Sequence, residues 1–532
     1  MTRPLLPDPG SLDASAIAGQ LVCVALRGYT GERPARAAFL EDLERHGWGG
    51  VIVFGGDLTA IQDLVAEADR RSAVPLLVTG DFERGLGQQF PRSGTTFPPM
   101  MALGATADPA LARATGRAIG VELRAAGIHV NYVPVADLAS EPANPIVATR
   151  AAGDDPEAVA ALVAAVVEGQ QAAGVAAAVK HFPGHGRTTL DSHDVLPFVE
   201  ADLEALDRSD WIPFRAGLRA GARLVMTAHV AFPALEPDGA RRPATFSPAL
   251  LDGLLRRSWG FRGLVCSDAL MMGALADEGP GEAARRALEA GVDWLLYPPD
   301  PPDVHAALTA GLGSGEVERA RCEAAAGRLL DLKAWAFARR PPAAVTGAAS
   351  LAEALAGLAL TADPPEPPPG PAWPDRARWV VVLDGGIGRE DVVLAEELGL
   401  PAAPRVLFVD TTEPASRVSE RLHEVREAAA GEAVACAVFS PIRAWKGRAG
   451  LSELGRDAVE AACGPAREAV LLIFSNPRIV REIRAPSRVV WAYGEDAASQ
   501  RAALAFLRGA LVPSGRLPVR LDVRAAPLPG AR

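Results

Sequence analysis

The chain has 532 residues, which is more than one ordinary domain holds, so we expect two or three domains. Its hydrophobic fraction of 49% and charged fraction of 22% are typical of globular proteins with sizeable cores. The net charge of −11 comes without an acidic run, which argues against a nucleic-acid partner and against binding to anionic membranes.

The N-terminal twenty residues carry three prolines in the first nine positions and no continuous apolar stretch, so they do not resemble a signal peptide. No apolar run approaches the length of a membrane span. The cysteines are scattered, odd in number and without CxxC spacing: Cys23, Cys266, Cys322, Cys436 and Cys463. This pattern predicts a cytoplasmic protein with reduced thiols, without structural zinc and without a disulfide framework. We expect no cofactor.

Eight short apolar segments alternate with helix-length segments in the first 300 residues. They span 21–28, 49–56, 74–81, 129–137, 175–182, 223–230, 263–270 and 293–300. Strands that are apolar on both faces suit a parallel sheet covered by helices. Eight strand–helix units predict an α/β fold of the (β/α)₈, TIM-like barrel type.

Polar side chains recur where these segments end. The positions at or just beyond the predicted strand ends are Asp81, Glu83, Asp137, Lys180, His181, His229 and Asp268. Any single one of them is explained as a helix cap or an ordinary loop residue. Seven at the same end of a barrel predict an active site, because barrel enzymes build their sites at the carboxyl ends of the strands.

A predicted helix near 349–361 leads into a segment with seven prolines between Pro364 and Pro374. This composition is typical of a stiff linker. Beyond it, five apolar segments alternate with helices and predict a smaller three-layer αβα open sheet. We therefore expect a catalytic barrel over 1–345, a helix and linker over 346–375, and an αβα sandwich over 376–532.

Asp268 ends an otherwise apolar segment, where a carboxylate is costly unless it has a task or a cationic partner. It is a candidate nucleophile for retaining glycoside hydrolysis, and a helix N-cap is the alternative interpretation. The segment KHFPGHGRTTLDSHDVLP, 180–197, holds three of the eight histidines and two aspartates. These side chains could bind a metal, move protons and contact sugar hydroxyls, or serve as ordinary loop polarity.

This segment, followed by GFRGLVCSDALMMGAL, resembles glycoside hydrolase family 3, specifically its β-N-acetylglucosaminidase branch. Supporting segments are NYVPVADL, NPIVATR, MTAHVAFPAL and GALVPSGRLPVRL. The resemblance is dense from about residue 20 to 300 and thinner beyond. Some positions depart from the family pattern. DFERGLGQQF replaces a DxEGGxVxR-like segment, and RAAG, which begins with the substrate arginine Arg150, replaces an RSF-like segment, so fine specificity does not follow from the resemblance.

The resemblance implies a catalytic role for Asp268 as the nucleophile and for His193 as general acid/base, with Asp191 as its dyad partner. It implies sugar contacts for Lys180, His181 and Arg150, and assigns the distal hydroxyls to Asp81. For His229 both support of the site and substrate contact stay open. Histidine suits proton transfer because it titrates near neutral pH.

The implied function is a retaining exo-glycosidase that releases terminal β-linked N-acetylglucosamine through a covalent glycosyl–aspartate, in cell-wall muropeptide recycling. The partner is a small carbohydrate, with no nucleic acid and no membrane. Alternatives are a family 3 β-glucosidase or β-xylosidase, a phosphorolytic β-N-acetylglucosaminidase, and an inactive carbohydrate-binding protein. A zinc site built from His181, His185 and His193 is a further alternative, but no HExxH segment accompanies them.

Overall fold

The computed structural model of the protein describes residues 6–340, 346–368, 370, 372–397, 406–443, 446–484 and 486–522. Contacts divide the chain into two compact units. The first contains the described residues up to Thr95, then Ala112–Asp137 and Val163–Ala348. The second contains Thr96–Leu111, Leu138–Leu162 and the described residues from Ala349 onward. Helices α5 (Pro109–Ala125) and α6 (Pro156–Ala172) contribute to both.

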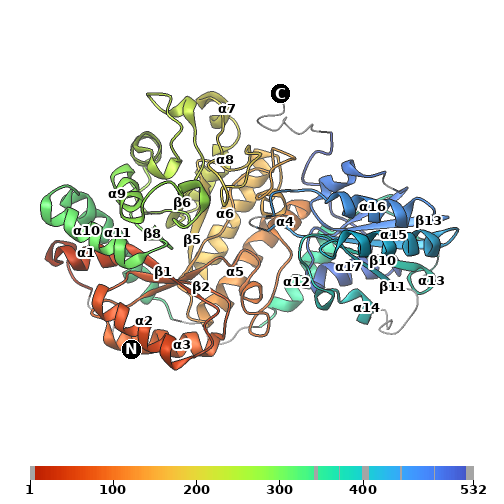
Figure 1. The fold of residues 1–532 in the computed structure, drawn as a ribbon, viewed down its shortest axis with the longest axis horizontal. Helices are drawn as coiled ribbons and strands as arrows, with labels where there is room; N and C mark the ends of the chain where they lie inside the picture. The colour runs from red at the N-terminus through yellow and green to blue at the C-terminus, as the bar shows by residue number, and fades with distance from the viewer. Residues whose placement is uncertain are drawn as a thin grey trace. The chain divides into compact units, whose positions relative to one another are not determined.

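The first unit is an eight-stranded parallel barrel (Figure 1), as the alternating apolar segments predicted. Its strands are β1 (Val22–Arg27), β2 (Gly50–Phe54), β3 (Leu77–Gly80), β4 (Val130–Asn131), β5 (Ala176–Phe182), β6 (Leu224–Thr227), β7 (Leu264–Cys266) and β8 (Leu295–Leu296). Neighbours along the chain pair with each other, and β1 also pairs with β8. A bridge between Cys266 and Trp294 completes the ring.

Helices surround these strands, as expected for a barrel whose sheet is apolar on both faces. They are η1 (Pro9–Ser11), α1 (Ala14–Gln20), α2 (Arg33–His46), α3 (Leu58–Arg71), η2 (Leu86–Gln88), α7 (Leu203–Asp207), α8 (Trp211–Arg219), η4 (Pro233–Leu235), η5 (Ala244–Phe246), the π-type helix η6 (Ala249–Ser258), η7 (Gly273–Leu275), α9 (Pro280–Ala290), α10 (Pro301–Ser314) and α11 (Arg319–Phe337). One apolar cluster collects side chains from all eight strands, including Cys23, Ile52 and Leu224, so the barrel interior is packed rather than open.

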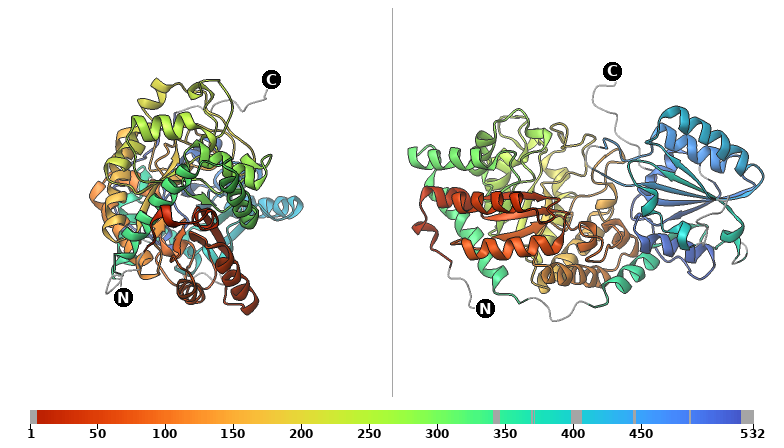
Figure 2. Two further views of the ribbon diagram at one scale, coloured as in Figure 1. Left: turned by 90° about the vertical axis from the view of Figure 1, so that its left-hand side faces the viewer. Right: turned by 60° about the horizontal axis from the view of Figure 1, so that its bottom comes forward.

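The second unit is an open sheet with helices on both faces (Figure 2). In spatial order its strands are β11 (Val406–Asp410), β10 (Arg378–Leu383), β12 (Ala433–Ser440), β13 (Glu468–Ser475), β14 (Arg488–Trp491) and the antiparallel β9 (Thr361–Asp363). Its helices are α4 (Met100–Thr106), η3 (Ala148–Arg150), α12 (Ala348–Ala359), α13 (Trp373–Arg376), η8 (Arg389–Asp391), α14 (Leu394–Glu397), α15 (Ala415–Ala429), α16 (Glu453–Cys463), η9 (Pro477–Glu482) and α17 (Ala497–Leu507).

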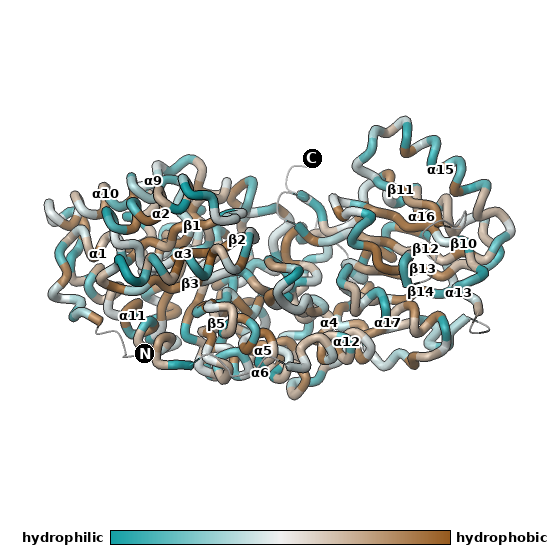
Figure 3. Tube along the Cα trace, turned by 90° about the horizontal axis from the view of Figure 1, so that it is seen from below, coloured by the Kyte–Doolittle hydropathy of each residue, from teal (hydrophilic) through white to brown (hydrophobic). Residues whose placement is uncertain are grey.

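Alternating side chains of this sheet fill two separate cores, because successive residues of a strand face opposite sides. Val380 and Val382 pack in one core together with α15 and α16, whereas Val381 packs in the other with α17. Figure 3 shows these strands as largely apolar and α15 with hydrophilic residues along its length. The three-layer αβα arrangement is therefore confirmed.

The sequence did not predict β9, which lies within the segment expected to be helix and linker, 346–375. It pairs antiparallel with β14, Val490 opposite Ala362. The boundaries at 345 and 375 stay a prediction, since the two compact units interleave along the chain. Pro369 and Pro371 of the expected linker, and 523–532 of the last expected domain, lie outside the described residues. Among the described helices, none combines the length and the apolarity needed to cross a membrane.

Candidate active site

The polar residues expected at the strand ends gather at the carboxyl end of the barrel. Asp81 and Glu83 follow β3, Asp137 follows β4, and Lys180 lies near the end of β5. The register of β5 against β6 shifts between Val179 and Phe182. This irregularity breaks the strict alternation of the strand, and both Lys180 and the next residue, His181, contact carboxylates of the site.

Lys180 forms the centre of a buried ion triplet. Its Nζ lies 2.7 Å from Asp81 Oδ1 and 2.7 Å from Glu83 Oε1, and its side chain is only 2% exposed. A lysine this deeply buried needs paired charge, which the two carboxylates supply. The Asp81 side chain remains 32% exposed, so this carboxylate has a surface open to a ligand.

Asp137 organises the turn that carries two of the histidines. Its Oδ2 accepts a hydrogen bond from the His181 ring Nδ1 at 2.7 Å, and its Oδ1 accepts the His185 backbone N–H at 2.6 Å. Burial raises the pKa of this carboxyl, but the His181 and His185 side chains hold it below its usual range. Gly184, with φ of 133°, lets the chain reverse between the two histidines.

The loop beyond this turn presents the His193 imidazole. Asp191 Oδ1 lies 2.7 Å from His193 Nδ1 and also accepts the His193 backbone N–H at 2.9 Å. Asp191 is 4% exposed, whereas the His193 side chain is 21% exposed. The carboxylate therefore holds the proton on Nδ1 and fixes the tautomer and orientation of the His193 ring.

Two further contacts fix this loop. The His185 ring bonds to Ser192 Oγ through Nε2 at 2.9 Å and to Thr188 Oγ1 through Nδ1 at 2.9 Å. The backbone N–H of Gly273 donates to His193 O at 2.9 Å, and a Cβ at 273 would stand 2.5 Å from that oxygen. The loop with His193 thus packs closely against the segment that follows Asp268.

Asp268 lies close enough to several of these histidines for their charges to affect its carboxylate. Burial raises the pKa of its carboxyl, but the His181 and His229 imidazoles and the Ala269 N–H outweigh burial and bring the pKa to about 2. The Ala269 N–H donates to Asp268 Oδ1 at 2.7 Å. The carboxylate is therefore ionised at neutral pH, as a nucleophile must be.

His229 supports the backbone next to this carboxylate. Its Nε2 lies 3.1 Å from Ala269 O, an atom that only accepts, so Nε2 carries the proton. Its Nδ1 then accepts from the Thr245 hydroxyl at 2.8 Å. Both ring nitrogens are therefore bonded to the protein, and a substrate contact of His229 stays a prediction.

Arg150 belongs to the second unit, whereas the other predicted site residues belong to the first. It ends η3, and its Nη1 donates to Ile146 O at 3.1 Å. Its sugar contact stays a prediction. From the sequence, Glu83 and Asp137 are only polar residues at strand ends. Their contacts in space, with Lys180 and His181 respectively, show which side chains they hold.

No three or more His, Cys, Asp or Glu side chains within the described residues are arranged to hold a metal ion. The histidines of 181–193 instead pair with carboxylates and hydroxyls. This arrangement is typical of proton transfer and sugar binding.

Comparisons with known proteins identify the family of the chain. Residues 17–332 match the model described as the glycosyl hydrolase family 3 N terminal domain. A β-hexosaminidase A of Pseudoalteromonas piscicida is 34% identical over 321 residues, 54% of this chain and 54% of that protein. A β-hexosaminidase of Thiobacillus denitrificans is 40% identical over 258 residues, 47% of this chain and 70% of its own length. The chain thus spans about half the length of the first of these relatives.

Solved structures match over nearly the whole chain. A glycoside hydrolase family 3 β-N-acetylglucosaminidase from Paenibacillus sp. aligns with a TM-score of 0.84 and 30% identity, covering 97% of this chain and 100% of that one. A β-glucoside phosphorylase aligns with a TM-score of 0.82 at 23% identity, covering 97% of this chain and 94% of that one, and shares the fold.

Proposed function

Because this chain belongs to glycosyl hydrolase family 3, we propose that it is a retaining exo-glycosidase that releases terminal β-linked N-acetylglucosamine. The observation that carries the proposal is the pair of buried Asp191 and partly exposed His193, with 2.7 Å between Oδ1 and Nδ1, in a loop packed against the segment that follows the ionised Asp268. The names of the relatives, β-hexosaminidase and β-N-acetylglucosaminidase, support N-acetylglucosamine as the sugar that is released.

Retaining hydrolysis needs a nucleophile on one side of the anomeric carbon and a proton donor on the other. Asp268 attacks the anomeric carbon, and the bond to the leaving oxygen breaks as His193 Nε2–H protonates that oxygen. Water then attacks the glycosyl–aspartate while neutral His193 takes its proton. Asp191 stabilises the imidazolium in the first step and holds the tautomer in the second.

We propose that the polar groups around Asp268 bind the sugar. In this proposal the exposed side of Asp81, held by Lys180, accepts hydrogen bonds from the distal hydroxyls, and His181 donates to the sugar from Nε2 because Asp137 occupies its Nδ1. The natural substrates we propose are muropeptide sugars in the cytoplasm. The five cysteines, all of them free thiols, agree with a reducing compartment.

The test is turnover of a panel of nitrophenyl β-glycosides of N-acetylglucosamine, glucose, xylose and N-acetylgalactosamine. We expect N-acetylglucosamine to be preferred and NMR to show the β-anomer as the first product. Asp268→Asn should lose about 10³-fold or more in rate, because the covalent step has no substitute nucleophile. Retention of rate within tenfold would refute the role of Asp268, and an α-anomer as first product would refute the retaining mechanism.

Phosphorolysis is the second candidate, because a neutral histidine tolerates a phosphate anion at the covalent intermediate better than a carboxylate does. The same panel is therefore run with and without inorganic phosphate. If glycosyl phosphate is the main product, the reaction is phosphorolysis and not hydrolysis. The proposed roles of Asp268 and His193 are the same in both reactions.

A further inference from the structure

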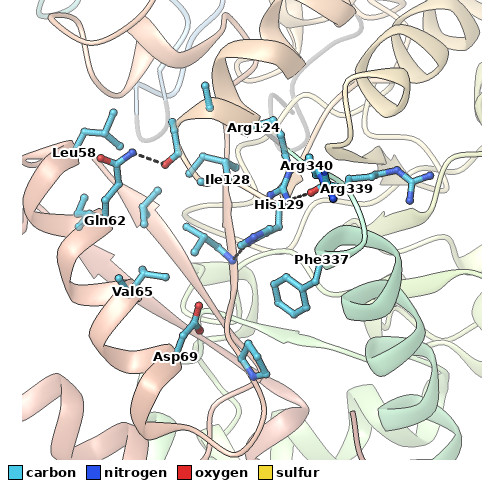
Figure 4. Close-up of a pocket in the computed structure, with 18 of the residues that line it drawn as sticks. Leu58, Gln62, Val65, Asp69, Arg124, Ile128, His129, Phe337, Arg339 and Arg340 are labelled. Carbon is cyan, nitrogen blue, oxygen red and sulfur yellow. Dashed lines mark hydrogen bonds between the residues drawn. The ribbon is translucent and has the colours of Figure 1, made fainter. Parts of the chain in front are cut away.

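A cavity of about 950 Å³ lies in the first unit, between α3 and the segments that precede β3 and β4 (Figure 4). Pro75, ahead of β3, and His129, ahead of β4, place it at the amino ends of these strands, away from the catalytic strand ends. Its walls are mostly apolar and include Val53, Leu58, Ile61, Val65, Ile128 and Phe337. A cavity of this size and lining is typical of small-molecule sites.

His129 offers one hydrogen-bond donor to this cavity. Its Nδ1 accepts the Val78 N–H at 3.0 Å, so the proton of the neutral ring resides on Nε2. Burial, assisted by the positive charge of Arg124, lowers the pKa of His129 to about 3, so the ring is neutral at physiological pH. No described residue accepts from Nε2, and Phe337 fixes the ring edge-on at 5.0 Å between centroids.

Arg124 offers a second donor, and Figure 4 shows it close to His129. Arg124 is only 6% exposed. Its Nη2 donates to Ala336 O at 3.2 Å and to Arg339 O at 2.6 Å, at the end of α11. Within the described chain, Nε and Nη1 donate to no residue and no carboxylate pairs with the guanidinium. A buried cation without a carboxylate favours an anion beside it.

The remaining charged groups of the cavity do not supply that anion. Asp69 is exposed, accepts the Leu76 N–H at 3.1 Å and appears in Figure 4 at the opposite end of the cavity from Arg124. The Arg339 guanidinium stacks on the Trp335 ring at 3.8 Å, and Arg340 adds positive charge at the same end as Arg124. The cavity thus combines apolar walls with two donors and net positive charge at one end.

We propose that this cavity binds an amphipathic carboxylate, with its apolar body against Val65, Ile128 and Phe337 and its carboxylate oxygens accepting from Arg124 and His129. Such a ligand matches both parts of the cavity at once. A fully apolar ligand leaves the donors unmatched, and a small hydrophilic anion leaves the walls uncovered. Binding here is separate from the catalytic site and does not depend on the proposed reaction.

The test is isothermal titration of the full chain with decanoate below its micelle concentration, beside decanol and acetate. We expect decanoate to bind with 1:1 stoichiometry and at least tenfold more tightly than either comparison compound. Arg124→Met should reduce decanoate affinity to that of decanol. Val65→Trp, which fills the cavity from α3, should abolish binding of both.

Arg117→Met is the matched control, because Arg117 lies on α5 two turns before Arg124, is exposed and does not line the cavity. It should leave decanoate affinity unchanged. The proposal is overturned if decanoate does not bind the natural chain, if decanol binds as tightly, or if folded Val65→Trp protein, judged by its thermal transition, still binds decanoate.

Discussion

The guanidinium of Arg478 donates to the carboxylate of Asp154 at 2.9 Å, although 324 residues separate the two in sequence. The same side chain donates to Ala139 O at 2.6 Å and is 5% exposed. Residues 139 and 154 lie at the two ends of the loop that carries Arg150, where the Ala139 N–H also donates to Gly153 O at 2.8 Å. Arg478, which lies between β13 and β14, therefore fixes the loop that carries Arg150, a predicted substrate contact.

We expect Arg478→Met to raise KM for the N-acetylglucosaminide about tenfold, with a smaller change in kcat, because the variant loosens the loop of Arg150 and leaves Asp268 and His193 in place. Arg478→Lys, which keeps the charge but loses the fork of donors, should recover part of the loss. Steady-state kinetics measures both.

Arg484→Met is the control for this pair, since Arg484 is exposed and lies six residues further along. It should behave as the natural enzyme. An Arg478→Met protein with unchanged KM would show that the loop keeps its position without this contact.

Removal of the proton donor should separate the two chemical steps. In His193→Ala, a nitrophenyl leaving group departs without protonation, so glycosylation slows only modestly, deglycosylation becomes limiting, and a burst appears. A natural disaccharide should lose about 10²–10⁴-fold, the usual contribution of general acid catalysis. Pre-steady-state and steady-state rates with both substrates provide the comparison.

Asp191→Ala should give a weaker version of the same pattern, because the imidazole remains but loses the carboxylate 2.7 Å from its Nδ1. If His193→Ala instead slows both substrates by equal factors, the loop positions sugar only, and the proton donor is another group.

A chain that ends after residue 345 should fold poorly. Met101, Ile146 and Val147 are at most 4% exposed and share a core with Val438 and Ile473, which this truncation removes. Each large apolar side chain left uncovered forgoes roughly 1.5–3 kcal/mol of burial. We expect low soluble yield and a lowered Tm relative to the full chain, in contrast to what a self-contained barrel over 1–345 would give.

Replacement of the newly uncovered side chains by polar ones, Met101→Ser with Ile146→Ser, should restore part of the yield of the truncated chain while destabilising the full one. A truncated chain with the natural sequence that is soluble and melts like the full chain would contradict this expectation.

Acid should destabilise the fold in part through His129. The pKa of His129 is about 3 in the folded protein, against an ordinary value of 6.5. Between these pH values the imidazole is therefore protonated in the unfolded chain and neutral in the folded chain. The free energy of unfolding therefore falls as the pH drops through this window, by up to about 1.4 kcal/mol per pH unit for one proton.

His129→Asn, whose amide oxygen can take the place of Nδ1 as acceptor for the Val78 N–H, should flatten that slope by up to the same amount. Urea unfolding at several pH values from 7 to 4 measures it, with His423→Asn as the control because His423 is exposed. If the free energy of unfolding depends on pH with equal slopes in the natural chain and in His129→Asn, groups other than His129 cause the acid sensitivity.

The barrel could be predicted from sequence because its strands are local apolar segments with regular spacing, and the site followed because parallel strands end at one face. The Asp191–His193 contact was expected from the resemblance of the DSH segment to its family, and the two side chains are indeed 2.7 Å apart. The roles of Asp137, Glu83 and Arg478 were not, because each depends on partners 44 to 339 residues away that no local pattern encodes. Strand β9 was missed for a related reason: three residues beside a proline run carry no strand pattern, and only β14 defines their structure.

The interleaving of the two units has a consequence for biosynthesis. Ile146 leaves the ribosome roughly 300 residues ahead of Val438, which belongs to the same apolar core, a delay on the order of 15–60 s at ordinary elongation rates. During that interval Thr96–Leu111 and Leu138–Leu162 have no core to join, so the second unit cannot finish folding until the late strands emerge. We therefore expect the nascent chain to be held by chaperones at these two segments, and its maturation to be posttranslational.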